Sequence, residues 1–272
     1  MRVEMRDKAQ RFRQLHESCF VIGNAWDAGS ARILAGLGYR ALATSSGAHA
    51  GTLGRRDGMV TRDEALAHAK AIVEATDLPV SADLEKCFAD DAAAAAETIR
   101  LAAGVGLVGC SIEDATGDKA KPLYEFGHAL ERVAAAAKVA RSLPFPFTLT
   151  ARSENFLRGK PDLEDTIKRL QAYEQAGADV LMAPGLPDLD SVRKVCAALS
   201  KPFNFMAGIK GKSFSVPELQ AAGVKRVSLA TSLWRMAMSG AIEAAREVKE
   251  KGSFGYMDRA LSTPDIAKYM RE

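Results

Sequence analysis

Residues 79–114 read PVSADLEKCFADDAAAAAETIRLAAGVGLVGCSIED and contain one complete strand–helix–strand repeat. The short apolar runs Pro79–Glu85 and Leu107–Asp114 predict two strands. Between them, Asp91–Ala103 has the length and period of an amphipathic helix, and its alanine run favours helix formation. A strand, a helix and a second strand in this order predict two parallel strands covered by the helix.

The same alternation continues on both sides of this unit. Eight short apolar runs predict strands, at Phe20–Asn24, Ala41–Ser46, Pro79–Glu85, Leu107–Asp114, Phe147–Glu154, Asp179–Pro184, Phe203–Gly208 and Arg226–Thr231. Segments of helical period lie between them, for example Thr61–Thr76, Asp91–Ala103, Ala129–Arg141, Leu163–Ala176 and Leu189–Leu199. The form of a capping box at Thr61–Glu64 and glycines at three helix ends, Gly38, Gly177 and Gly223, agree with these boundaries.

Eight such units in 272 residues predict one α/β domain, a (β/α)₈ TIM barrel spanning residues 1–272. An open doubly wound sheet is the alternative, but residues 23–30 read GNAWDAGS and lack the glycine fingerprint of a dinucleotide-binding turn. Two segments fall outside the eight units, an N-terminal helix at Met5–His16 and a tail at Gly252–Glu272. The tail contains a predicted helix, Thr263–Met270, which we expect to pack on a neighbouring subunit.

The composition is that of an ordinary soluble protein, with 47% hydrophobic and 26% charged residues. The 37 basic and 34 acidic residues nearly balance, which argues against nucleic-acid or membrane-surface partners. No apolar run is long enough to span a bilayer, and the N-terminus lacks the apolar stretch of a signal peptide. Scattered cysteines without metal-site spacing favour a reducing cytoplasm over a disulfide framework or a zinc site: Cys19, Cys87, Cys110 and Cys196.

In a TIM barrel the active site lies at the carboxyl ends of the strands. Polar residues concentrate at these predicted ends: Asn24, Trp26 and Asp27, then Ser45, Ser46 and Gly47, then Asp83 and Glu85, Glu113 and Asp114, Arg152 and Glu154, and Thr231 and Ser232. Asp27 or Asp114 taken alone is better explained as a helix cap or a solvated charge. The set from the third to the fifth strand is different, because the barrel brings it to one place.

Three carboxylates carry the metal hypothesis. Asp83 and Glu85 are two residues apart on a predicted strand and are therefore expected to face the same side. Glu113 ends the adjacent strand. Clustered carboxylates repel one another unless a cation, protons or a basic group offsets them, and an all-oxygen donor set suits Mg²⁺.

Other residues at the same ends could hold an anionic substrate. Arg152 is placed to clamp a carboxylate with its planar guanidinium group, although it could instead be only an ion-pair partner of Glu113 or Glu154. The Ser45–Gly47 segment offers hydroxyl groups and backbone N–H groups. Among the histidines only His49 could reach the barrel mouth, and a surface role is equally consistent with its position. Cys87 lies beside carboxylates, where a thiolate is disfavoured, so we expect an inert thiol.

These segments resemble the isocitrate lyase/phosphoenolpyruvate mutase superfamily in order and spacing. The matching pieces are Thr44–Gly47, the Asp57 region, Pro79–Glu85, Cys110–Asp114 and Thr150–Glu154. The resemblance covers almost the whole chain. It implies Mg²⁺-dependent chemistry on a 2-oxo or 2-hydroxy acid through an enolate, and a homo-oligomer, a dimer or tetramer, in which the last barrel helix is swapped between subunits.

The resemblance also implies roles for individual residues. Three carboxylates would hold Mg²⁺, with Mn²⁺ as the alternative: Asp83, Glu85 and Glu113. Catalytic roles fall to Arg152, to Ser46 and to Asp57 on a gating loop. We expect the substrate to contact Trp26, Ser45, Ser46, Gly47, Ala48, Asp83, Arg152 and Asn204.

The chain departs from the superfamily pattern in ways that affect the reaction. Ala115–Tyr124 contains no cysteine or histidine, whereas isocitrate and methylisocitrate lyases carry their proton-donating cysteine there. Ala183–Leu186 lacks an expected glutamate, Glu85 stands where aspartate is common, and Cys87 and Ala89 replace glycines. We expect a carbon–carbon lyase or a decarboxylase acting on a small dicarboxylic acid. The alternatives are a phosphonate-acting enzyme, of the phosphoenolpyruvate mutase or phosphonopyruvate hydrolase type, and a non-catalytic barrel that binds 2-oxo acids.

Overall fold

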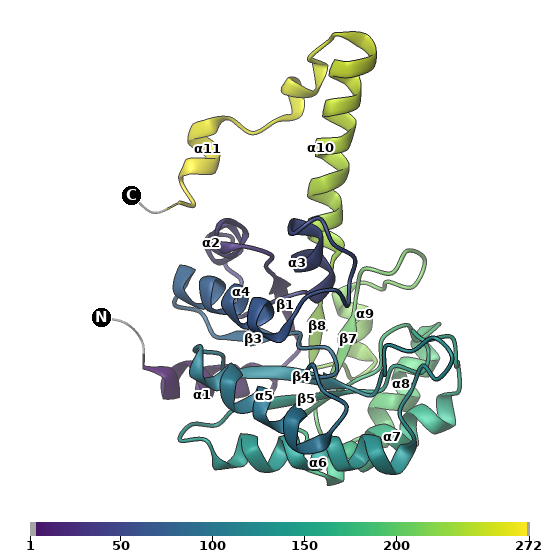
Figure 1. Ribbon diagram of the computed structural model, residues 1–272. Coiled ribbons are helices and arrows are strands. Elements are labelled where there is room, and N and C mark those ends of the chain that lie inside the picture. The colour runs from purple at the N-terminus through teal and green to yellow at the C-terminus, as the bar shows by residue number, and fades with distance from the viewer. Residues whose placement is uncertain (1–3, 271–272) are drawn as a thin grey trace.

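The eight predicted strands form one closed barrel in the computed structural model, which describes residues 4–270 (Figure 1). Every strand pairs in parallel with its neighbour in chain order, and Phe20 lies opposite Arg226 where the first strand meets the last. The strands are β1 (Phe20–Asn24), β2 (Leu42–Ala43), β3 (Val80–Ala82), β4 (Gly109–Glu113), β5 (Thr148–Arg152), β6 (Val180–Met182), β7 (Phe203–Met206) and β8 (Arg226–Ser228). The expected (β/α)₈ barrel is confirmed.

Most strands are shorter than the apolar runs that predicted them. β1 has the predicted bounds, but β3 ends at Ala82 although the apolar run continues to Glu85. The difference matters for the site, because Asp83 and Glu85 lie in the loop that follows the strand. Residues in a loop do not obey the alternation of side chains along a strand.

Helices follow the strands at the expected places. They are α1 (Met5–Leu15), α2 (Ala28–Gly36), α3 (Ser46–Thr52), α4 (Arg62–Ala75), α5 (Ala92–Gly104), α6 (Phe126–Ser142), α7 (Leu163–Gln175), α8 (Leu189–Ala198), α9 (Val216–Ala221), α10 (Ser232–Lys251) and α11 (Thr263–Ala267), with a short 3₁₀ helix η1 (Gly255–Arg259). The capping box of Thr61 and Glu64 forms as predicted. Within residues 4–270, no helix is both long and apolar enough to cross a membrane.

The N-terminal helix α1 closes the end of the barrel opposite the strand carboxyl ends. Ala9 and Phe12 of α1 form a buried cluster with Phe20, Ile22 and Val108, which lie at or beside the strands. His16 caps the helix and is buried. Its Nδ1 lies 2.8 Å from the Phe12 carbonyl oxygen, and its Nε2 lies 3.3 Å from Nη1 of Arg226 on β8.

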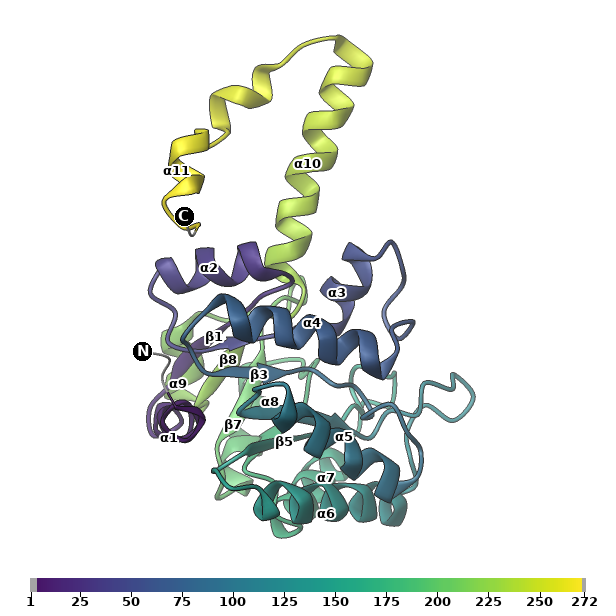
Figure 2. The same cartoon turned by 60° about the vertical axis from the view of Figure 1, so that its left-hand side comes forward.

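The chain leaves the barrel after β8. α10 extends away from the barrel, and none of its residues is buried (Figures 1 and 2). The following segment returns to α2, where a Cβ atom on Gly36 would lie 2.5 Å from the ring of Tyr269. The end of the tail contacts its own chain at α2, and packing of the C-terminal helix on a neighbouring subunit stays a prediction, while α10 is the helix that extends outwards. The last two residues of the predicted tail, 271–272, lie outside the described residues.

The buried His16 predicts a pH dependence of stability. Burial, followed by the charge of Arg226, lowers the pKa of His16 to about 3. The folded chain therefore binds this proton less tightly than the unfolded chain, and the stability present above pH 6.5 falls as the pH drops towards 3. Between pH 7 and pH 5 we expect a loss of about 2 kcal/mol in unfolding free energy that His16→Asn does not share.

Urea unfolding at both pH values measures this difference. His128→Asn is the matched control, because His128 is partly exposed on α6 and should leave the pH dependence as it is in the wild type. Equal losses in the wild type and in His16→Asn would contradict the prediction.

Candidate active site

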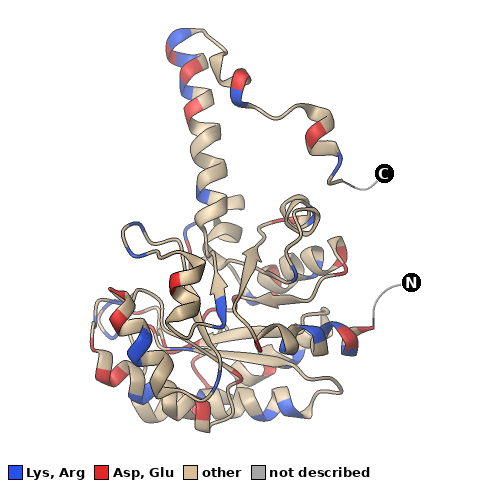
Figure 3. Ribbon diagram, turned by 180° about the vertical axis from the view of Figure 1, so that it is seen from behind, with Lys and Arg blue, Asp and Glu red and all other residues tan. Residues whose placement is uncertain are grey.

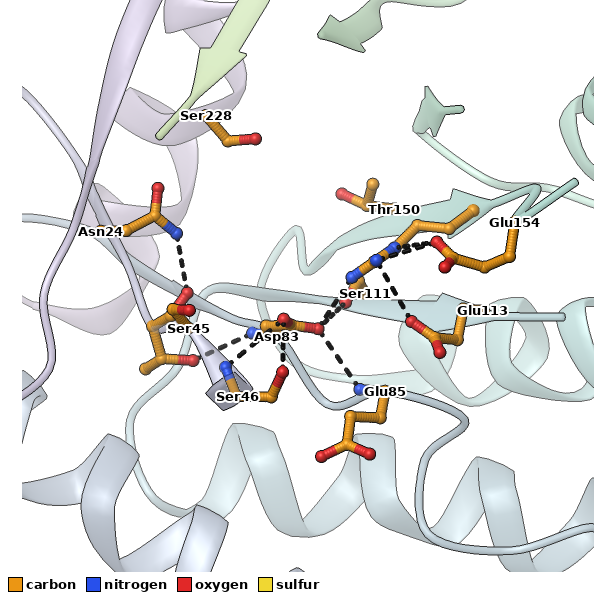
Figure 4. A network of polar contacts seen from close by, with 12 residues as sticks. Asn24, Ser45, Ser46, Asp83, Glu85, Ser111, Glu113, Thr150, Glu154 and Ser228 are labelled. Carbon is orange, nitrogen blue, oxygen red and sulfur yellow. Dashed lines mark hydrogen bonds and ion pairs between the residues drawn. The ribbon is translucent and has the colours of Figure 1, made fainter. Parts of the chain in front are cut away.

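A buried arginine joins three carboxylates at the carboxyl ends of β3, β4 and β5 (Figure 4). The Arg152 guanidinium group lies 2.9 Å from Oδ1 of Asp83, 3.3 Å from Oε2 of Glu113 and 2.8 Å from Oε1 of Glu154. Glu113 and Arg152 are the last residues of their strands and lie side by side in the sheet register. Parallel pairing of neighbouring strands therefore creates this cluster, as expected from the predicted strand ends.

Asp83 is the point at which this cluster meets the loop after β2. Its carboxylate accepts hydrogen bonds from the Ser46 hydroxyl group at 3.0 Å, from the Ser46 backbone N–H at 3.4 Å and from the Ser111 hydroxyl group at 3.3 Å. Burial alone would raise the pKa of Asp83, but Arg152 and the Ser46 contacts outweigh it and hold the pKa below its usual value. Asp83 is therefore a stable anion at neutral pH.

Glu85 does not face the same side as Asp83, and the prediction from strand alternation is wrong on this point. Its backbone has a φ angle of 51°, in the left-handed region, so the chain turns after Asp83. Figure 4 shows the Glu85 carboxylate directed away from the cluster of Asp83 and Glu113. Burial, followed by the charges of Asp83 and Asp57, raises the pKa of Glu85 to about 7.

Glu113 is buried among charges of both signs. Besides Arg152, it contacts Nη2 of Arg158 at 3.1 Å, and Arg158 also lies 3.4 Å from the buried Glu154. Burial and the charge of Glu154 raise the pKa of Glu113 well above its usual value, against the opposing effect of both arginines. Sequence reasoning missed Arg158, although it stands four residues after Glu154 and could have been found from that spacing.

The strand ends carry more negative than positive charge. Five carboxyl groups, which we call the acidic rim, gather there: Asp57, Asp83, Glu85, Glu113 and Glu154. Two guanidinium groups contact them, those of Arg152 and Arg158. Such an excess favours binding of a cation or a proton.

The donor set suits a hard divalent cation, because every carboxylate in it offers oxygen atoms. Among residues 4–270, no three His, Cys, Asp or Glu side chains converge closely enough to form a complete metal-ligand cluster. Mg²⁺ usually keeps several water ligands, so carboxylates that do not converge can hold it through water. The residues of the rim therefore fit Mg²⁺ by charge and chemistry.

The loop after β2 lies beside the rim. Ser45 accepts the Ala48 N–H as the N-cap of α3, which makes it a structural residue as well as a candidate contact. A Cβ atom on Gly47 would lie 3.3 Å from the Asp57 carboxyl carbon, so the absence of a side chain lets Asp57 approach α3. Asp57 is thus next to Gly47 and near Glu85, as expected for a residue on a loop over the site.

Several other polar strand ends are structural. Asp27 caps α2 through a capping box with Ser30. Asp114 is buried and accepts hydrogen bonds from the Glu154 N–H and the Tyr173 hydroxyl group, at 2.8 Å each. Asn24 donates to the Thr44 carbonyl oxygen and accepts the Leu229 N–H, so it joins β1 to its neighbours.

The geometry does not support the expected substrate contact of Asn204. Its amide oxygen accepts from Nε of Arg226 at 2.7 Å, and its amide nitrogen donates to the Ser228 hydroxyl group at 3.0 Å. The side chain is fully buried near the start of β7, inside the barrel and not at its mouth. Trp26 contributes its carbonyl oxygen to a contact with His68, and a substrate contact of its side chain stays a prediction.

The loop that carries Glu85 is held from another helix. Arg132 of α6 is buried and donates to the carbonyl oxygens of Lys86, Ala89 and Asp90. Cys87 lies in the same loop, and burial raises the pKa of its thiol to about 12, in agreement with the expected inert thiol. Sequence reasoning gave Arg132 no role, because only the fold brings it to this loop.

Comparisons with known proteins agree with this architecture. A sequence model of the phosphoenolpyruvate phosphomutase family matches residues 12–249. A Burkholderia cenocepacia J2315 protein of solved structure, with the provisional description lyase/mutase, is 48% identical with a TM-score of 0.95 over 97% of this chain and 96% of that one. A 2-methylisocitrate lyase from Halalkalibacterium halodurans is 30% identical over 91% of this chain and 84% of its own length.

A more distant structure shares the fold. The chain has a TM-score of 0.86 and 24% identity with 2,3-dimethylmalate lyase, described as a PEP mutase/isocitrate lyase superfamily member, over 96% of this chain and 94% of that one. The resemblance found in the sequence, and with it the assignment to an enzyme superfamily, is confirmed. The chain belongs to the phosphoenolpyruvate phosphomutase family of the PEP mutase/isocitrate lyase superfamily.

Proposed function

We propose that this protein is a Mg²⁺-dependent carbon–carbon lyase or decarboxylase that acts on a small 2-oxo or 2-hydroxy (di)carboxylic acid through an enolate. The observation that carries the proposal is the acidic rim around Arg152, because it combines a surplus of carboxylates with a guanidinium group at the barrel mouth. The similarity to a 2-methylisocitrate lyase favours cleavage of a carbon–carbon bond.

Asp83, Glu85 and Glu113 would hold Mg²⁺ or Mn²⁺, directly or through water. The bound cation would supply Lewis-acid polarisation of the oxygen atoms of a 2-oxo acid. Arg152 would hold a substrate carboxylate, since a guanidinium group surrounded by acids carries a fixed positive charge. The backbone N–H group of Gly47 would orient the other end of the acid, and the Ala48 N–H and the Ser46 hydroxyl group would join it by exchanging their present acceptors, Ser45 and Asp83, for the substrate.

The remaining residues have positioning roles in this proposal. Asp57, beside Gly47, would exclude water when the substrate binds, because the segment that carries it lies over the rim. Arg158 holds Glu113 and Glu154 in place. A phosphonate-acting enzyme is the second candidate, and the phosphoenolpyruvate phosphomutase family match favours it.

We further propose a homo-oligomer in which α10 packs on a second copy of the chain. Large apolar side chains on this helix are exposed, with Met236 at 72% and Ile242 at 56%. Figure 3 shows most of the charged residues of α10 towards its outer end, and residues 236–242 read MAMSGAI without a charge. An exposed, uncharged stretch of this kind on a helix is typical of a subunit interface.

An assay panel tests the proposed activity. We expect turnover of at least one C4–C6 2-oxo or 2-hydroxy diacid, followed by ¹H NMR, and its loss when EDTA removes divalent cations. Arg152→Lys should lower kcat/KM by about 100-fold, because lysine cannot replace the planar contacts of arginine. Release of phosphate from phosphonopyruvate would instead indicate the phosphonate-acting alternative.

The control variant is Arg193→Lys, since Arg193 forms an exposed pair with Asp190 on α8, away from the rim. Its kcat/KM should match that of the wild type. If the panel gave no turnover although Mg²⁺ and a 2-oxo acid bound, the protein would be a non-catalytic binding barrel and the proposal would be wrong.

Charge introduced into α10 tests the oligomer. The double variant Met236→Glu/Ile242→Glu should sediment as a monomer in analytical ultracentrifugation, whereas the wild type should sediment as a dimer or tetramer. Lys249→Glu, at the charged outer end of the helix, is the control and should leave the assembly intact. A monomeric wild type would rule out the interface.

A further inference from the structure

His49 has two buried ring nitrogens that lack a hydrogen-bond partner. The residue lies on α3, three positions after Ser46, and only 8% of it is exposed. Neither Nδ1 nor Nε2 makes a hydrogen bond of good geometry among the residues that the structure describes, although the backbone of Glu64 lies close enough to the ring to raise its pKa. Because a buried polar group without a partner costs about 1–3 kcal/mol, such a group calls for a bound molecule or another explanation.

The neighbours of His49 keep its imidazole ring neutral. The His68 ring of α4 stacks on it, with the ring centroids 3.8 Å apart and the planes 14° from parallel. Burial, followed by His68, lowers the pKa of His49 to about 4; Arg55 adds to this effect and Glu64 opposes it. A neutral imidazole ring offers one N–H donor and one bare nitrogen acceptor.

His49 and His68 line a pocket that also reaches the acidic rim. The other lining residues are Thr44, Ser45, Ser46, Val60, Ala65, Asp83, Glu85 and Phe88. Glu85 is half-buried, and its carboxylate has no hydrogen bond or ion pair within residues 4–270. Its left-handed backbone turns the carboxylate away from Arg152 (Figure 4).

The pocket has room for about one water molecule. A water needs two to four polar partners to be held in a protein interior, and this pocket offers the His49 ring, a carboxylate and the Ser46 hydroxyl group. A neutral ring that both donates and accepts suits water better than an anion or a cation.

We infer that this pocket binds one water molecule, which the His49 ring holds. The water donates a hydrogen bond to the Glu85 carboxylate and thereby positions this carboxylate. His49 is then a positioning residue for the cation site, which is the part of the inference that rests on the proposed function. Replacement of a group that orients a metal-binding carboxylate commonly changes the metal affinity by about 10–100-fold.

The water itself can be tested without any activity. A high-resolution crystal structure of the metal-free wild type should show a water peak at about 2.7–3.2 Å from a ring nitrogen of His49 and from a Glu85 oxygen. No peak at this position would overturn the inference. Crystals soaked in Mn²⁺ give a second criterion, because an anomalous peak bonded to His49 would make it a metal ligand and overturn its assigned role.

Variants test the positioning role through Mn²⁺ affinity, measured by isothermal titration calorimetry. His49→Phe removes both nitrogens and should weaken Mn²⁺ binding by about 10-fold, while His49→Gln keeps a donor and an acceptor and should restore most of the affinity. Lys138→Phe, at an exposed position of α6, is the control and should bind Mn²⁺ as the wild type does. Thermal unfolding of each variant shows whether a change in affinity reflects loss of the fold.

The outcomes separate the two proposals. Equal Mn²⁺ affinity in the wild type and His49→Phe would refute the positioning role and leave the proposed metal site intact. A wild type that binds no Mn²⁺ would refute the cation site, and the positioning role with it, whereas the water peak would still support the pocket as a water site.

Discussion

The ion pairs of Arg152 are the interaction on which the rest of the site depends. Its guanidinium group contacts Asp83, Glu113 and Glu154, which come from three successive strand ends. Carboxylates this close would repel one another strongly in a buried environment without a shared positive charge. Because Arg152 does not neutralise the whole rim, the same arrangement keeps the surplus charge that favours a divalent cation. Structural support and the surplus of carboxylates thus come from one cluster.

Parallel pairing of neighbouring strands is what brings these groups together. β3, β4 and β5 are short, and each delivers its polar residue at or just after the last paired position. Other elements supply the side chains that hold the rim in place. Ser46 comes from α3, Arg132 from α6 and Arg158 from the loop after β5. The site is therefore built on rigid strand ends, while the groups around it come from helices and loops.

Much of this site could be predicted from the sequence, for reasons that particular residues make clear. Glu113 and Arg152 were predictable as neighbours, because alternating strands and helices fix which strand ends are adjacent. The direction of the Glu85 side chain could not be predicted, since it depends on a left-handed turn that Arg132 holds from a distant part of the chain. The environment of His49 could not be predicted either, because it depends on the packing of His68 from α4 against its ring. A helical pattern alone could not show that α10 leaves the barrel.

Three residues beside the rim have a left-handed backbone conformation that lowers the stability of the chain. Glu85, Cys87 and Phe88 have φ angles of 51°, 57° and 58°, a conformation that costs about 1 kcal/mol or more for each residue other than glycine. Glycine at position 85 would relieve that strain and at the same time remove a carboxylate from the rim. Selection for thermal stability alone would therefore remove a carboxylate from the acidic rim, because Glu85 costs stability in the conformation in which it supplies that carboxylate.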